Sequence, residues 1–248
     1  MSSLFRTVVH VIKTHDTEHQ LLMFSMDGSG NCGVLVTKFQ SILAEGHQVM
    51  VTLRDGVFNL DDKGMSFRER VSKFANECFA QGSGLLKNLW ILDENATKEK
   101  KLEYFNKWDN EMRSMNAWVD MLWLCLAVKM LNINLRIYTP RWKKSGSTKC
   151  IDPNQPMDVH DVPLSSSVGG PTLKVIRVTS AISTNAHYNL LLDAEEVSSL
   201  QYTYGASTDG ETDDTRFIMS RKGDEVQPAL EAAMKAKMTA ELDELDDF

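Results

Sequence analysis

The chain has few cysteines, and they follow none of the patterns that disulfide frameworks or zinc sites require. Its 4 cysteines lie singly, without a CxxC pair, in a chain of 248 residues. This spacing excludes a disulfide scaffold and predicts free thiols in a reducing compartment, so we expect a cytoplasmic protein. Thiol chemistry is therefore possible, and we expect neither a metal nor another cofactor.

Long hydrophobic runs and an N-terminal export signal are also missing. No apolar run reaches the ~18 residues that a membrane span needs. The longest candidate, residues 118–138, is interrupted by charged and amide side chains. The first fifteen residues, MSSLFRTVVHVIKTH, hold no long apolar stretch, so we expect no signal peptide and no membrane partner.

An excess of basic charge is absent too. The formal net charge is −7, and the whole acidic excess lies in residues 209–248, while the rest of the chain is balanced. Nucleic-acid phosphates attract a basic face on a protein, so this charge distribution argues against a nucleic-acid partner.

What the sequence does contain is the pattern of an ordinary globular domain, with 42% hydrophobic and 25% charged residues. Period-two alternation predicts strands over residues 7–13, 20–24, 133–138, 172–179 and 188–192, and more weakly over 47–60. Apolar residues at helical spacing predict helices over 34–43, 66–78, 93–115 and 118–131. Residues 140–171 hold most of the prolines and predict a long polar loop or insertion. The predicted fold class is α+β.

Composition divides the chain into three regions. Residues 1–204 are expected to form the main folded domain, which is a reasonable length for one hydrophobic core. Residues 205–226 are interpreted as an acidic linker, and residues 227–248 as a C-terminal amphipathic acidic helix with leucines and methionines on one face.

A glycine-rich loop leads into the first predicted helix, and a cysteine stands where the two meet. Gly28 and Gly30 lie in this loop, and Cys32 follows directly before the helical pattern. Only a thiolate attacks a carbonyl, and a helix N-terminus lowers the pKa of a thiol. Glycines tolerate the backbone angles that turn N–H groups inward, as an oxyanion hole requires. The alternative is a turn that carries a buried core cysteine.

A second candidate element lies late in the chain, at the head of an apolar strand. Alternation places His187 and Asn189 on the same face of this strand. The amide can accept a hydrogen bond from the imidazole and fix its tautomer, as in a Cys-His-Asn arrangement. The alternative is a histidine at a strand end beside a surface asparagine.

Together these residues resemble the ovarian-tumour (OTU) family of cysteine proteases and deubiquitinases. Four blocks occur in the family's order between residues 20 and 195: DGSGNC at 27–32, WVDMLWLCLA at 118–127, NLRIY at 134–138 and HYN at 187–189. The resemblance implies a papain-like OTU fold with a central sheet flanked by helices. It also implies that Cys32 is the nucleophile, His187 the general base and Asn189 the residue that orients it.

The resemblance further implies an oxyanion loop that includes Asp27, Ser29, Gly30 and Asn31. The family usually has an aspartate three residues before the cysteine, where this chain has Ser29, and Asp27 lies two residues further back. The sequence therefore leaves open how the loop is braced. These departures suggest a divergent member of the viral or bacterial-effector type.

The function implied is a cysteine-dependent deubiquitinase, which removes ubiquitin or a ubiquitin-like modifier from proteins through a thioester. Its partners would be ubiquitin or ubiquitin-like conjugates, in the host cytosol if the source is a virus or a secreted effector. Two alternatives stay open: a non-catalytic ubiquitin-binding module with the same fold, and a papain-like protease that cuts a viral polyprotein.

Overall fold

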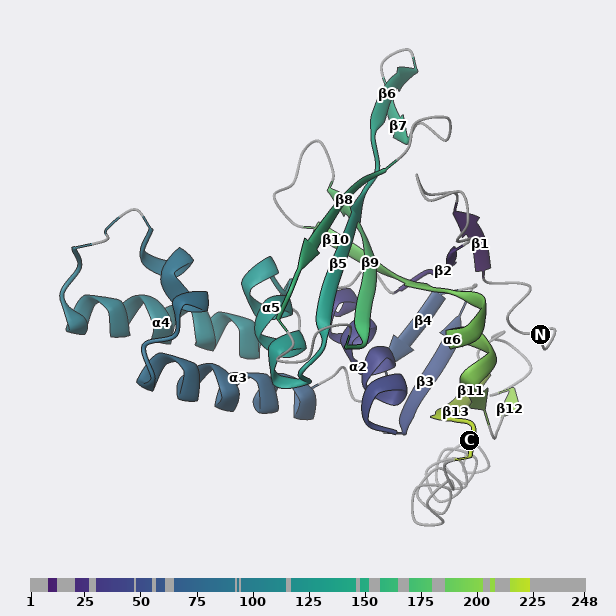
Figure 1. Ribbon diagram of the computed structural model, residues 1–248, viewed down its shortest axis with the longest axis horizontal. Helices are drawn as coiled ribbons and strands as arrows, with labels where there is room; N and C mark the ends of the chain where they lie inside the picture. Colours follow the sequence, from purple (N-terminus) through teal and green to yellow (C-terminus); the bar gives the residue numbers. More distant parts are fainter. Residues whose placement is uncertain are drawn as a thin grey trace, which may run out of the picture.

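The computed structural model shows an α+β protein with two large β-sheets, one helix between them and a group of helices to one side (Figure 1). The structure describes residues 9–12, 21–26, 30–46, 48–54, 57–60, 65–91, 93, 95–114, 117–145, 148–151, 157–164, 170–179, 186–202, 206–207 and 215–223. The helix expected over residues 227–248 lies outside the described residues.

Helix α2 (Cys32–Glu45) is the centre of the core. It contacts strands of both sheets, and its side chains Val34 and Ile42 are fully buried, as is the polar Thr37. A helix that is apolar on nearly all sides belongs inside a protein. The helix ends at Gly46, whose φ of 71° lies in the left-handed region that glycine tolerates best.

The first sheet contains six strands in the order β1-β2-β10-β9-β5-β8. Strands β5 and β9 are parallel, and the other neighbouring pairs are antiparallel. The strands are β1 (Val9–Ile12), β2 (Leu21–Phe24), β5 (Asn134–Thr139), β8 (Asp158–Val162), β9 (Thr172–Thr179) and β10 (Ala186–Leu192). The alternating patterns in the sequence predicted all of these except β8.

The two faces of this sheet bury different sets of side chains. Tyr188 and Leu190 of β10 lie in the main core with α2, whereas Leu191 lies in a smaller cluster with Ile176 of β9. Side chains alternate between the faces of a strand. His187 and Asn189 therefore lie on the same face as Leu191, opposite the face that carries Tyr188.

The second sheet corrects one expectation, because it includes residues that were interpreted as a linker. Residues 215–221 form β13 (Thr215–Arg221), which pairs with β3 at the positions Phe217–Val51 and Ile218–Met50. Met219 is fully buried in the same core cluster as the side chains of α2, and this burial outweighs the acidic surroundings that suggested a linker. The other strands are β3 (Val49–Arg54), β4 (Val57–Leu60), β11 (Leu200–Tyr202) and β12 (Ala206–Ser207).

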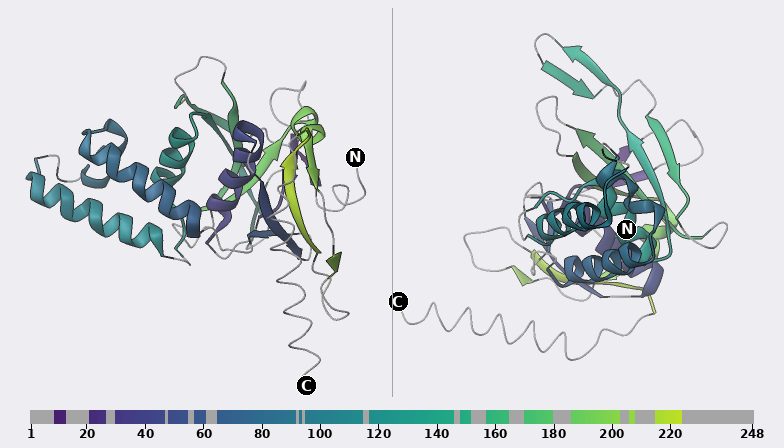
Figure 2. Two further views of the ribbon diagram at one scale, coloured as in Figure 1. Left: turned by 90° about the horizontal axis from the view of Figure 1, so that it is seen from below. Right: turned by 90° about the vertical axis from the view of Figure 1, so that its left-hand side faces the viewer.

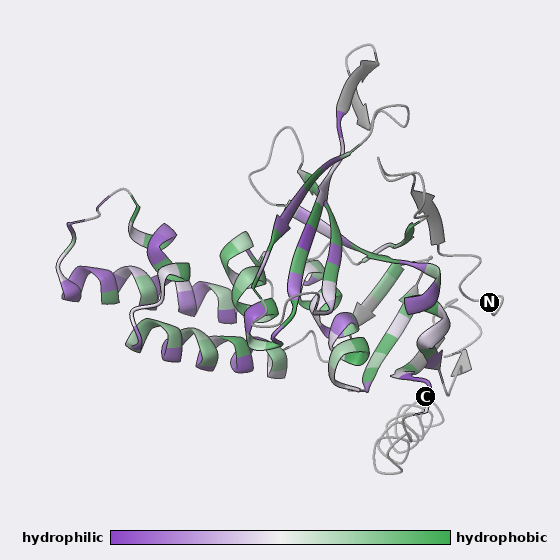
Figure 3. Cartoon of the chain, viewed as in Figure 1, coloured by the Kyte–Doolittle hydropathy of each residue, from purple (hydrophilic) through white to green (hydrophobic). Residues whose placement is uncertain are grey.

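The remaining helices extend away from the sheets as a group, which Figure 2 shows from two further directions. They are α3 (Met65–Ala80), the 3₁₀ helix η1 (Gly84–Trp90), α4 (Lys98–Arg113) and α5 (Met121–Met130). Apolar stripes along α3 and α4 face each other (Figure 3). Phe79 and Phe105 stack between them with ring centroids 4.7 Å apart. The carboxylate of Asp120 joins α4 to α5, because it caps α5 and accepts from the indole of Trp108 at 2.9 Å.

The long loop predicted over residues 140–171 is wrong in part. The segment forms a hairpin of β6 (Trp142–Ser145) and β7 (Thr148–Ile151), which projects from the sheet, and then β8 at the sheet edge (Figure 1). β8 pairs with β5, and the ion pair between Arg136 Nε and Asp161 Oδ1, at 2.6 Å, reinforces the pairing. Most side chains of β8 are exposed, so its sequence carried no apolar alternation.

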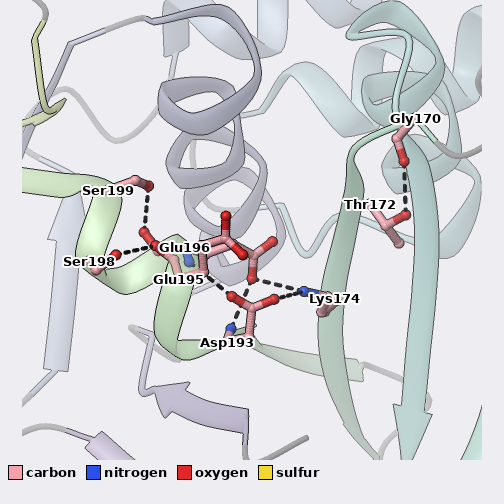
Figure 4. Close-up of polar contacts among 8 residues, drawn as sticks. All are labelled: Gly170, Thr172, Lys174, Asp193, Glu195, Glu196, Ser198 and Ser199. Carbon is pink, nitrogen blue, oxygen red and sulfur yellow. Dashed lines mark hydrogen bonds and ion pairs between the residues drawn. The ribbon is translucent and has the colours of Figure 1, made fainter.

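A short helix follows β10 and is fixed by partly buried charged side chains. Helix α6 (Ala194–Ser199) begins with a capping box between Asp193 and Glu196. Lys174 of β9 donates to both carboxylates, at 2.8 and 2.9 Å (Figure 4). These bonds tie the end of β10 to its neighbour strand.

The contact between α2 and the start of α5 can be tested at Gly33. A Cβ at this position would lie 2.1 Å from Cγ2 of Val119, which is 3% exposed. The valine is β-branched and cannot turn away easily. We therefore expect Gly33→Ala to lower the free energy of unfolding by about 1–3 kcal/mol, as overpacking does.

The matched variant removes the obstructing methyl group. In Gly33→Ala combined with Val119→Ala, urea unfolding should show at least about 1 kcal/mol less loss than the sum of the single variants. Strictly additive losses would contradict the contact.

Candidate active site

Cys32 is the first residue of α2 and is 1% exposed. The turn before it contains Gly30 with a φ of 100°, a left-handed conformation that a residue with a Cβ rarely adopts. A helix N-terminus carries partial positive charge from its unpaired amides. The thiol of Cys32 therefore lies where the fold favours a thiolate.

The turn before Cys32 is held by an arginine that the sequence reading missed. Arg68 of α3 is fully buried, and its Nη2 donates to Oδ1 of Asn31 at 3.0 Å and to the carbonyl oxygen of Gly30 at 3.5 Å. Asn31 occupies the N-cap of α2, but its side chain does not cap the helix. The asparagine oxygen is engaged by the guanidinium instead.

His187 and Asn189 lie side by side on β10. The distance between His187 Nε2 and Asn189 Oδ1 is 2.9 Å. The same oxygen accepts the backbone N–H of Met26, also at 2.9 Å. Because an amide N–H can only donate, the atom that faces it must be the oxygen of Asn189.

This pairing determines which imidazole nitrogen is basic. An oxygen that already accepts from Met26 can bind His187 Nε2 only if that nitrogen carries the proton. In the neutral ring Nδ1 is then the acceptor. The imidazole is thus held in the tautomer that a general base needs, with Nδ1 as the nitrogen that takes a proton.

The nucleophile turn and β10 meet at the first turn of α2. A Cβ built on Gly33 would lie 3.5 Å from Cδ2 of Tyr188. Burial raises the pKa of the Tyr188 hydroxyl to about 12, and the charge of Cys32 contributes to the rise. Cys32 is therefore close enough to this part of β10 to act on it electrostatically.

Residues 25 and 26 follow the last pair of β2 with β10. The pairing of β2 with β10 ends at Phe24 and Leu190. The next residues leave the sheet, since Ser25 accepts from the N–H of Phe58 at 3.0 Å and Met26 donates to Asn189. Met26 is thus bound to the side chain of Asn189, which shares its face of β10 with His187.

Two other thiols, those of Cys78 and Cys125, lie in the described part of the chain. Burial raises the pKa of Cys125 to about 11, and the nearby Asp120 adds to the effect. Burial also raises the pKa of Cys78. Both thiols stay protonated near neutral pH, so neither is a competing nucleophile.

The structure places Gly30, Asn31 and Cys32 at the start of α2 and His187 and Asn189 side by side on β10. The hydrogen bond from Met26 to Asn189 joins the segment ahead of Cys32 to β10. Asp27 and Ser29, the other two residues expected in the oxyanion loop, lie outside the described residues. The catalytic roles of all these residues stay predictions. In the described part of the chain, no three His, Cys, Asp or Glu side chains are grouped as metal ligands, and no helix is long and apolar enough for a membrane span.

Comparison with known proteins gives likenesses to solved structures alone. The chain matches no protein-family model and no curated protein. Among solved structures it is similar to the OTU domain of OTUD1, with 13% sequence identity, over 70% of this chain and 86% of that chain. The TM-score is 0.40, which is too low to establish a shared topology, so the case for a function depends on the residues themselves.

The tautomer of His187 is directly measurable. In ¹⁵N NMR spectra, with His187→Gln used for assignment, we expect the Nε2–H tautomer in the wild type near pH 8. Asn189→Ala removes the acceptor and should give a mixture of the two tautomers, while backbone amide spectra of the core stay dispersed. A wild-type ring with the proton on Nδ1 would contradict the arrangement.

Proposed function

We propose that the protein is a cysteine isopeptidase of the OTU type, which removes ubiquitin or a ubiquitin-like modifier from proteins. The observation that supports it best is the shared oxygen of Asn189, which joins the chain ahead of Cys32 to the ring of His187. This arrangement serves a cysteine nucleophile with a histidine base and an orienting amide. The substrate class follows from the motif resemblance over residues 20–195.

In the proposed reaction Nδ1 of His187 takes the proton of the Cys32 thiol. The sulfur attacks the carbonyl carbon at the C-terminal glycine of the modifier, and a tetrahedral oxyanion forms. His187 then gives its proton to the leaving lysine amine, and the C–N bond breaks to leave a thioester. Water, deprotonated by the same imidazole, hydrolyses the thioester and frees the thiol.

The oxyanion would be stabilised by backbone amides at the start of α2. The N–H groups of Gly30, Asn31 and Cys32 belong to the turn that Gly30 bends, and amides of a helix N-terminus attract negative charge. We assign Asp27 and Ser29 to the same loop, as the resemblance implies. Each well-placed donor contributes roughly 10²–10³ in kcat.

One observation favours a second candidate function. Cys32 is 1% exposed, so a substrate carbonyl reaches the sulfur only after a neighbouring segment moves. A non-catalytic module that binds ubiquitin would retain this closed site and would turn over no conjugate. The third possibility, a papain-like protease of a viral polyprotein, would cleave peptides that contain no ubiquitin.

A ubiquitin carrying a C-terminal electrophile tests the proposal. The wild type should form a covalent adduct at Cys32, identified by peptide mass mapping, and Cys32→Ala should form none. His187→Ala should slow labelling by about 10²-fold or more, because a general base supplies that order of rate.

Cys125→Ser is the matched control, because its thiol is protonated near neutral pH and should not react. Labelling that persists in Cys32→Ala would exclude Cys32 as the nucleophile. Binding of unmodified ubiquitin without any labelling or turnover would favour the non-catalytic module.

A further inference from the structure

Arg68 is an internal cation that joins several segments around Cys32. Its side chain is fully buried. Nη1 donates to the carbonyl oxygen of Met112 at 2.6 Å, and Nη2 donates to that of Ala117 at 2.8 Å, besides its bonds to Gly30 and Asn31. One guanidinium thus fixes the nucleophile turn to the end of α4 and to the segment that leads into α5.

Each of these acceptors is neutral. Among the described residues, Arg68 forms no ion pair with a carboxylate, and its Nε has no hydrogen-bond partner. A buried charge without a counter-ion is costly, and proteins normally pair it. An anion near Arg68 would therefore be stabilised strongly, since Coulomb attraction is stronger away from water.

The Cys32 thiolate is the anion that the fold offers. Arg68 contacts the two residues directly before Cys32, and the charges of Arg68 and Cys32 act on each other. Burial lowers the pKa of Arg68, and the charge of Cys32 opposes that shift. A guanidinium stays protonated in proteins. The attraction between the two groups therefore changes the ionisation of the Cys32 thiol and not that of Arg68.

Other charged or titratable groups lie on the elements packed against α2 and α3. They come from the strands behind α2, from the start and middle of α5 and from α4, and they are His187, Tyr188, Arg177, Asp120, Cys125 and Asp109. Asp120 raises the pKa of Tyr188, and Arg177 lowers it. Arg68 is the cation whose hydrogen bonds reach the nucleophile turn itself.

We propose that Arg68 is a positioning residue for the nucleophile: it holds the Gly30–Cys32 turn in shape and keeps the Cys32 thiol ionised. The proposal deepens, and depends on, the proposed role of Cys32 as the nucleophile. By engaging Oδ1 of Asn31, Arg68 also keeps that oxygen from capping α2. The N–H groups at the start of α2 then donate no hydrogen bond to the Asn31 side chain, and they can donate to an oxyanion.

The two parts of this role need different properties of the side chain. Ionisation of the thiol needs a positive charge, whereas the turn needs several donors in a planar fork. Lysine keeps the charge but presents one ammonium, so it cannot reproduce bonds to four acceptors on three segments. Methionine has a similar length and neither property. Comparing Arg68→Lys with Arg68→Met therefore separates charge from geometry.

The test is the pH dependence of Cys32 alkylation by iodoacetamide, followed on the peptide that contains Cys32. In Arg68→Met the midpoint should rise by about one pH unit or more, which means roughly tenfold slower alkylation below the midpoint. In Arg68→Lys the midpoint should stay within about half a unit of the wild type, while the rate of reaction with the ubiquitin electrophile falls by about tenfold.

The matched control is Arg70→Met, the same substitution two residues on in α3 at an exposed position. Its profile should superimpose on that of the wild type. A change in access to the sulfur scales the rate at every pH and leaves the midpoint in place, so it cannot imitate the predicted shift. Circular dichroism and urea unfolding establish that each variant is folded under the assay conditions.

The outcomes separate this proposal from the proposed function. An unchanged midpoint in folded Arg68→Met would overturn the role of Arg68, even if the ubiquitin electrophile labels Cys32. A raised midpoint in Arg68→Met, in a protein that does not react with the ubiquitin electrophile, would support the role of Arg68 and contradict the proposed isopeptidase activity. If Arg68→Met does not fold, Arg68→Lys is the deciding variant. Lysine keeps the positive charge, so a midpoint raised by about one unit in this variant would contradict the claim that the charge keeps the thiol ionised.

Discussion

The side-chain oxygen of Asn189 holds the candidate site together. It accepts one hydrogen bond from the backbone of Met26 and one from the ring of His187, each at 2.9 Å. The first joins residues 163 positions apart in the chain. The second fixes the tautomer of the imidazole, so one atom joins the segment ahead of Cys32 to the ring of His187.

The packing of the surrounding elements holds α2 in place next to β10. Helix α2 is buried between two sheets, so its first residue cannot move independently of β10. Gly33 gives the close approach to Val119 and Tyr188 that this packing needs. Arg68 of α3 also holds the start of α2, because its hydrogen bonds fix the turn before Cys32 to α4 and to the segment before α5. Helices α3 and α4 therefore help to hold the turn before Cys32 in place.

The sequence indicated the candidate catalytic residues, but it did not indicate Arg68, which holds the turn before Cys32. A glycine-rich loop before a helical pattern indicated Cys32, and strand alternation indicated that His187 and Asn189 share a face. Arg68 could not be identified, because a one-dimensional pattern does not distinguish it from Arg70, which is exposed. Only the packing of α3 against α4 decides which arginine is buried.

Errors in the fold had a similar cause. β8 has mostly exposed side chains, and prolines surround it, so its pairing with β5 leaves no apolar signal. β13 lies in an acidic stretch, and its partner β3 is far away in sequence. Local composition dominated both predictions, whereas long-range pairing decided the structure.

The most direct test of the account is the pH dependence of Cys32 alkylation in the wild type and in His187→Gln. If Nδ1 of His187 takes the thiol proton, the wild-type midpoint lies well below the ~8.5 of a free thiol. The midpoint in His187→Gln then rises by about one unit or more. Superimposable profiles in the two folded proteins would contradict the claim that β10 supplies the base for Cys32.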